Sequence, residues 1–228
     1  MQTMAVSARG ELTKTTYEAL TDLLRQEIVS GRLPGGSRVT IAEVADRYGV
    51  SQMPVREALQ RLHGEGLVVL LAHRGASVLT LDAQFVRNIY DVRGAVESLL
   101  ARLSLPNLTN SNMARLADIC AQVCVAAEAG DEKSVRGLNS EFHTLLYRHA
   151  YNPVALAIYD RYAGLIGALR NKYGVGPGRL PEIAAELVEV LEAVRAQDVE
   201  RLALLVSRAC ELAKQDLLRL MDQAQQAD

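Results

Sequence analysis

The chain has 228 residues, and 49% of them are hydrophobic, which suffices for two domains that each bury a core. Its 25 Lys and Arg residues are balanced by 27 Asp and Glu residues, which excludes a strongly basic nucleic-acid-binding field. No apolar run approaches the ~20 residues of a membrane span, no signal-peptide core is present, and three scattered cysteines exclude a disulfide framework, so we expect a cytoplasmic protein without a membrane partner.

The aromatic content of only 4%, with no Trp and abundant Ala and Leu, favours a mainly α protein. Residues 1–12 show no hydrophobic periodicity and are interpreted as a disordered tail. A first helix is predicted from Thr15 or Thr16 to about Ser30, where the Gly- and Pro-rich stretch 31–36 ends it. Its buried side is expected to carry Tyr17, Leu20, Leu24 and Ile28.

Two short amphipathic helices follow, separated by a tight turn. The first is capped by Thr40 and closed by Gly49 in a left-handed turn, with apolar residues at helical spacing: Ile41, Val44, Ala45 and Tyr48. The second has Ser51 as its N-cap and Pro54 in its first turn, and repeats that spacing in Val55, Ala58, Leu59 and Leu62. Together they predict a helix-turn-helix.

The start of the second helix is predicted to bind DNA, because its apolar stripe leaves polar side chains exposed at the positively poled end. Such an end suits a major groove, where phosphates and base edges are both within reach. The residues expected to contact DNA from these two helices are Arg47, Ser51, Gln52, Met53 and Arg56. The alternative is that Arg56 pairs with Glu57 or Glu43 and that the helix start is merely solvated.

Two β-prone runs, 67–71 and 76–81, flank a predicted hairpin tip. From this tip His73, Arg74 and Gly75 are expected to contact a minor groove or a phosphate, with a solvated turn as the alternative. Helices and hairpin together predict a winged helix-turn-helix domain over residues 13–80. Residues 1–80 hold 9 Lys and Arg against 8 Asp and Glu, so DNA affinity must come from locally placed cations and two half-sites.

The remaining chain, 82–222, predicts an all-α helical bundle large enough to enclose a small pocket. Pro, Gly and Asn-Pro breaks divide it into six helices, over about 82–105, 109–129, 131–149, 152–173, 179–196 and 198–222. Cys120 and Cys124, one turn apart, are interpreted as core residues rather than a redox pair. The cationic stretch 170–173 and Arg179 are interpreted as a solvated helix end.

The first domain resembles the GntR family of bacterial transcription regulators. The residues that carry the resemblance are Leu33-Pro34-Gly35, Gly49-Val50-Ser51, Pro54-Val55-Arg56-Glu57-Ala58-Leu59, Leu62, Glu65-Gly66-Leu67-Val68 and Arg74-Gly75. The second domain is similar to the FCD type of effector-binding domain, found in the branch of the fatty-acid-responsive regulator. Its marks are Tyr90-Asp91-Val92-Arg93 with Glu97, Asn139 with Phe142-His143, Asn152-Pro153 and the closing helix pair.

The resemblance implies a homodimer that binds a short palindromic operator in double-stranded DNA and whose affinity is modulated by a small effector, often an organic acid. The effector-binding residues it implies are Tyr90, Arg93, Asn139 and His143. Several have simpler alternatives: Arg93 pairs with Glu97, His143 is a hydrogen-bonded core residue, and Tyr90 only packs.

Two departures from the family pattern matter. Many relatives have Arg at the position of Gln52 and another near Ala42; because Gln pairs with adenine, we expect an operator shifted from the usual guanine-containing core. Many FCD domains hold a metal on one Asp and three His, whereas the matching positions here are Asn139, His143, Leu187 and Ala209. We therefore expect no cofactor or metal, with a weak site at His143 and Cys210 as the alternative.

The leading hypothesis is a ligand-responsive repressor, nucleoid-associated when bound to DNA. An enzyme is not expected, since the sequence has only four histidines, no paired Glu-x-x-His motif, no phosphate-binding loop and no nucleophile motif. The alternative function is a constitutive DNA-binding dimer that has lost effector and metal binding. A sealed apolar core would favour this alternative, and a cavity onto which Arg93 and His143 converge would oppose it.

Overall fold

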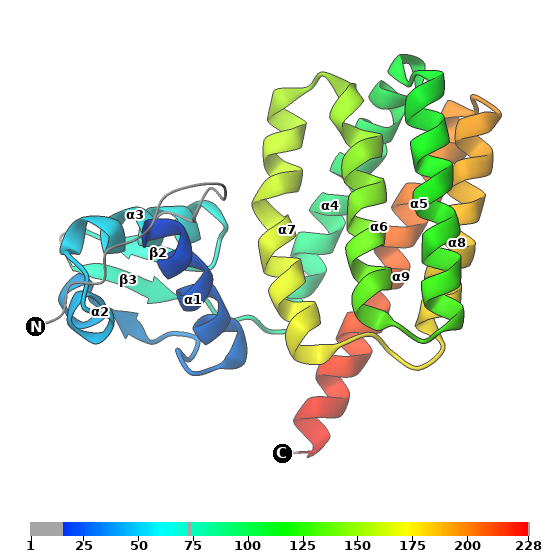
Figure 1. Cartoon of the computed structure of the whole chain (residues 1–228). Coiled ribbons are helices and arrows are strands. Elements are labelled where there is room, and N and C mark those ends of the chain that lie inside the picture. Colours follow the sequence, from blue (N-terminus) through cyan, green and yellow to red (C-terminus); the bar gives the residue numbers. More distant parts are fainter. Residues whose placement is uncertain (1–15, 73, 228) are drawn as a thin grey trace, which may run out of the picture. The chain divides into compact units, whose positions relative to one another are not determined.

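The computed structural model describes residues 16–72 and 74–227, and the chain divides into two compact units, Met1–Leu79 and Thr80–Asp228. The predictions made for the tail 1–12 and for His73 lie outside the described residues. The two units are shown in Figure 1 and are described in turn.

The first unit is the predicted winged helix. Helices α1 (Thr16–Ser30), α2 (Ile41–Tyr48) and α3 (Gln52–Gly64) are joined by an antiparallel sheet in the order β1-β3-β2. Strands β2 (Val68–Leu71) and β3 (Gly75–Val78) form the predicted hairpin. The two-residue strand β1 (Arg38–Val39) was not predicted, because its pairing with Ser77 and Ala76 is made across the fold and leaves no pattern in so short a run.

The core of the first unit lies between α1 and α3. The buried side chains of α3 include Val55, Leu59 and Leu62, at the predicted helical spacing. Leu24 of α1 and Leu67, which follows α3, are buried with them. A buried carboxylate completes the contact: Glu65, at the end of α3, accepts two hydrogen bonds of 2.7 Å from the Arg25 guanidinium of α1. This bidentate pair ties the C-terminal end of α3 to α1.

The second unit is a bundle whose long helices stand side by side in Figure 1. They are α4 (Ala83–Ser104), α5 (Asn110–Glu128), α6 (Glu132–Tyr147), α7 (Pro153–Tyr173), α8 (Arg179–Arg195) and α9 (Val199–Ala227). Short 3₁₀ turns follow α4 (Leu105–Asn107) and α6 (Arg148–Ala150). All six predicted helices are present. The largest difference is at α9, which continues past 222 because the Gln- and Ala-rich end contains no helix breaker.

The core of the bundle runs between these helices and includes Leu100, Leu116, Phe142 and Tyr147. Cys120 packs within it, and burial raises its pKa to about 11, as expected of a packing residue rather than a reactive thiol. Helix α4 packs along α9, and α5 packs against α6 and α8. None of the helices in the described part of the chain is long and apolar enough to cross a membrane.

Candidate functional site

The start of α3 is exposed and lacks an internal cap. Ser51 occupies the predicted N-cap position with extended backbone, but its hydroxyl makes no capping hydrogen bond. The first turn carries no acidic residue. Gln52 and Arg56 are exposed beside it, and 64% of Met53 is accessible. The first-turn amides therefore remain free to bind an external acceptor.

Helix α2 shows how the same unit closes a helix start internally. The Thr40 hydroxyl accepts from the Glu43 amide at 3.2 Å, and the Glu43 carboxylate accepts from the Thr40 hydroxyl and amide. These hydrogen bonds lower the pKa of Glu43. The positive pole of α2 is thus occupied by the chain's own carboxylate, whereas that of α3 is open.

The two arginines predicted to touch DNA differ in their surroundings. Within the described residues, the Arg56 side chain makes no hydrogen bond or ion pair, so the alternative in which it pairs with Glu43 or Glu57 is not observed. Arg47 lies 3.2 Å from the Glu27 carboxylate of α1, with half of its side chain exposed. Of the two arginines, Arg47 therefore has an intramolecular ion pair and Arg56 has none among the described residues.

Among the described residues of the hairpin tip, Arg74 is an exposed cation. Gly75, by contrast, is buried with φ of 101°, and a Cβ placed there would lie 2.1 Å from the Val39 carbonyl oxygen. Only glycine permits that close approach of β3 to β1. The packing of β3 against β1 therefore explains the glycine at position 75 without any contact with DNA.

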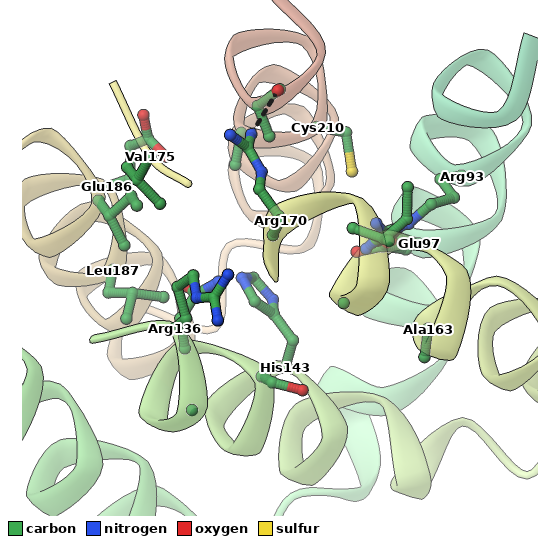
Figure 2. A pocket seen from close by; sticks show the side chains of 18 of the residues that line it. Arg93, Glu97, Arg136, His143, Ala163, Arg170, Val175, Glu186, Leu187 and Cys210 are labelled. Carbon is green, nitrogen blue, oxygen red and sulfur yellow. Dashed lines mark hydrogen bonds and ion pairs between the residues drawn. The ribbon is translucent and has the colours of Figure 1, made fainter. Parts of the chain in front are cut away.

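A cavity of about 460 Å³ lies inside the second unit, within the size range of small-molecule sites. Side chains from α4, α6, α7, α8 and α9 line it, together with Val175 from the connection between α7 and α8. All four residues predicted to bind an effector reach it: Tyr90, Arg93, Asn139 and His143. Figure 2 shows Arg93 and His143 entering from different helices.

Arg93 is engaged by the chain itself. Its Nε donates to Glu97 Oε1 at 2.7 Å, as in the alternative kept open above, and its guanidinium lies 5.3 Å from the centre of the Tyr90 ring. Burial opposes the charge of Arg93, but the Glu97 carboxylate more than offsets this and raises its pKa. Tyr147 also donates to Glu97, at 3.0 Å. Arg93 is thus a paired cation at the cavity wall.

His143 is part of the same network. Its Nδ1 lies 3.1 Å from the Tyr147 hydroxyl, and burial lowers its pKa, with Glu97 acting in the opposite direction. The imidazole is therefore neutral near pH 7. Burial likewise raises the pKa of Cys210 well above its usual range, so this thiol stays protonated and is a poor metal ligand.

Three further arginines line the cavity, and sequence reasoning missed them: Arg136, Arg170 and Arg179. The prediction that Arg170 and Arg179 form a solvated helix end was wrong. Only 12% of the Arg170 side chain is exposed, and it lies 2.6 Å from Asp216, while Arg179 is buried against Glu186 at 2.9 Å. Arg136 and Arg170 are held by Asn171 and Asp216, which lie far along the chain. Arg179 pairs with Glu182 and Glu186 on its own helix, a spacing that the sequence did offer.

Comparison with known proteins decides the family. The sequence profile of the FCD domain matches residues 88–212, and that of the gntR family of bacterial regulatory proteins matches residues 16–78. The chain belongs to the GntR family. Its second unit is an FCD domain, and its membership makes it a transcriptional regulator rather than an enzyme.

Relatives of this GntR regulator span most of its length. The HTH-type transcriptional regulator YdhC of Bacillus subtilis is 27% identical over 178 residues, covering 78% of this chain and 80% of its own. The HTH-type transcriptional repressor RspR of Escherichia coli is 30% identical over 143 residues, covering 63% of each chain. The solved structure of McbR from Escherichia coli, at 22% identity, has a TM-score of 0.66 over 93% of this chain and all of its own, a likeness that shows the fold.

The residues at the FCD metal positions do not fit a metal. Asn139, His143, Leu187 and Ala209 all line the one cavity, so the positions matched by sequence do converge in space. Only one of the four is a ligand for a transition metal at neutral pH. Across the described residues, no group of three or more His, Cys, Asp or Glu is arranged to hold a metal ion. The residues at these positions therefore do not supply the ligand set of a typical transition-metal site.

Proposed function

We propose that this GntR regulator is a ligand-responsive repressor that binds a short palindromic operator as a homodimer, with its DNA affinity altered by a small organic anion in the FCD cavity. Two winged helices would dock in successive grooves of the palindrome. The effector would favour a dimer arrangement whose half-site spacing fits DNA less well, which requires different effector affinities for the two arrangements.

The observation that carries the DNA-binding part is the open start of α3. It combines uncapped first-turn amides, no acidic residue in that turn and an Arg56 side chain without a partner among the described residues. Phosphate oxygens supply acceptors for the amides, and a guanidinium reads guanine or contacts phosphate. Gln52, next to it, is suited to adenine.

The observation that carries the regulatory part is the cavity itself. A constitutive dimer without an effector is favoured by a sealed apolar core, whereas here a cavity of about 460 Å³ is lined by Arg93, His143 and further cations. A space of this size, onto which polar side chains converge, is typical of a small-molecule site. We therefore prefer the ligand-responsive function to the constitutive one.

A selection of bound DNA from a random pool, using the purified full chain at stated salt, tests the proposal. We expect enrichment of a short palindrome, bound by two chains per site as measured by analytical ultracentrifugation. The Gln52→Arg variant, selected in parallel, should shift the preferred half-site toward guanine. No enrichment at low salt from a folded protein would contradict DNA binding, and wild-type enrichment of the usual guanine opposite Gln52 would contradict the adenine assignment.

A further inference from the structure

One face of α6 presents polar groups to the FCD cavity whose hydrogen-bonding capacity is only partly used. Arg136, Asn139 and His143 are spaced i, i+3, i+7, which places them along one helix face, and all three line the cavity. Figure 2 shows the Arg136 and His143 side chains both reaching into it from α6. A ligand in the cavity would meet these groups together.

Arg136 differs from the other cavity arginines in having buried donors without acceptors. Its Nη2 donates to Asn171 Oδ1 at 2.6 Å, and its Nε lies 3.7 Å from Glu132 Oε1, beyond hydrogen-bond distance. Its Nε and Nη1 are buried without a hydrogen-bond partner among the described residues. Buried donors are normally satisfied, so these two are available to an acceptor from outside the chain, a water or a ligand.

The charges around the cavity point the same way. The lining cations are Lys133, Arg93, Arg136, Arg170 and Arg179, and the lining acids are Glu97 and Glu186. Arg93 is neutralised by Glu97, Arg179 by Glu186, and Arg170 by Asp216. Arg136 has only the longer 3.7 Å ion pair with the part-exposed Glu132, which does not line the cavity. The surplus positive charge of the lining is therefore at Arg136 and Lys133, and it favours an anion over an ammonium group.

The hydrogen bonds of His143 fix which of its nitrogens carries the proton. Tyr147 gives its single hydroxyl proton to Glu97 Oε2, so its oxygen accepts from His143, and Nδ1 must be the protonated nitrogen. In the neutral ring Nε2 is then an acceptor with a free lone pair. It has no hydrogen-bond partner within the part of the chain that is described. His143 Nε2 can therefore accept a hydrogen bond from a donor group of a ligand.

We propose that Arg136 binds the carboxylate of the effector and that His143 Nε2 accepts a hydrogen bond from a hydroxyl of the same molecule, so that the effector is a small hydroxy acid. This rests on the proposed effector role of the FCD cavity. Arg136 then determines the preference for a carboxylate, and Tyr147, which positions the His143 ring, determines the preference for a hydroxyl. Arg93, which is paired with Glu97, mainly lines the cavity.

Isothermal titration with matched acids tests the proposal in buffer containing a chelator. The pairs are acetate and glycolate, propionate and lactate, and succinate and malate, whose members differ by one hydroxyl. We expect at least one hydroxy acid to bind the full chain at least about fivefold more tightly than its partner, the worth of one hydrogen bond. Equal affinities within every pair, or no binding at concentrations up to tens of millimolar, would overturn it.

Three variants separate the two roles. Arg136→Gln should weaken every binding acid at least about tenfold, because a charge-assisted hydrogen bond is lost. Arg208→Gln, at an exposed helix position of the same unit, is the matched control and should leave affinity unchanged. Tyr147→Phe should reduce the hydroxy-to-deoxy ratio toward one while retaining carboxylate binding, an outcome that a merely structural role would not give.

The tautomer can be measured without a ligand. Long-range ¹H–¹⁵N spectra of histidine-labelled protein should show His143 protonated at Nδ1 and not at Nε2, and the reverse pattern would overturn the proposal even if Tyr147→Phe failed to fold. Operator binding is measured on the same samples. If the wild-type protein binds its operator but shows no preference for hydroxy acids over the matched deoxy acids, this inference alone is refuted. If the wild-type protein does not bind DNA, the proposed function is refuted.

Discussion

The two candidate sites of this protein are built in opposite ways. The start of α3, which we propose to bind DNA, is a surface of one helix whose donors are open, whereas the FCD cavity is enclosed by five helices whose charges are mostly paired with one another. At the first site a side chain can be removed without disturbing the fold. At the second, chemistry and folding share the same residues. This difference predicts how each site responds to substitution.

The largest effect is expected at Glu97. This carboxylate is buried, with Arg93 and Tyr147 both hydrogen-bonded to it. Glu97→Ala leaves a buried cation unpaired and should lower the free energy of unfolding by about 3–5 kcal/mol in urea denaturation. The double variant Arg93→Met/Glu97→Leu removes both charges and should regain most of the loss. If Glu97→Ala were as stable as the wild type, the hydrogen bonds of Glu97 with Arg93 and Tyr147 would not stabilise the fold.

At the DNA-binding end, Arg56→Ala should change binding but not folding. Loss of a guanidinium contact worth about 1–3 kcal/mol should weaken operator affinity by about 5- to 150-fold in fluorescence anisotropy. The unfolding free energy should stay within about 0.5 kcal/mol, because Arg56 is exposed. Arg115→Ala, an exposed arginine of the other unit, is the control. Equal operator affinity in the wild type and Arg56→Ala would remove α3 from the interface.

The hairpin tip gives an intermediate case. Gly75→Ala places a Cβ 2.1 Å from the Val39 oxygen at a φ of 101°, so β1 and β3 must separate. We expect the unfolding free energy of the first unit to fall by an amount on the order of 2 kcal/mol, measured by amide hydrogen exchange in β3. Gly64→Ala is the matched control, since nothing lies within 4 Å of its Cβ position. Equal behaviour of the two variants would contradict the close approach.

The smallest effect separates the two helix starts of the first unit. Thr40→Ala breaks the α2 capping box and should cost about 1 kcal/mol. Ser51→Ala removes a hydroxyl that makes no capping bond, so thermal unfolding should change little. A Ser51→Ala variant as destabilised as Thr40→Ala would mean that α3 is internally capped in solution and that its amides are not free for phosphate.

The same contrast explains what the sequence could predict. Helix spacing and caps are local, so Thr40, Gly49 and the stripe through Leu59 predicted α2, α3 and the exposed side of α3. The family motifs then predicted Arg93 and His143 in one pocket. Arg170 was misread because its partner Asp216 lies 46 positions away, and the pairing exists only once α7 and α9 pack together.

Strand β1 was missed for the same reason, since its two residues are a strand only through their pairing with β3. The hydrogen-bond state of Arg136 and His143 is equally non-local. It depends on Asn171, Tyr147 and Glu97, contributed by three different segments. Sequence spacing could place these residues on a face but could not show which of their donors and acceptors remain unused.

The most direct test of the central claim is hydrogen–deuterium exchange of the full chain with and without its selected operator. First-turn amides of α3 have no intrahelical acceptor and no side-chain cap, so they should exchange rapidly in the free protein. We expect saturating operator to slow exchange at residues 51–57 while the residues lining the FCD cavity change less. Saturated binding without protection of residues 51–57 would contradict it.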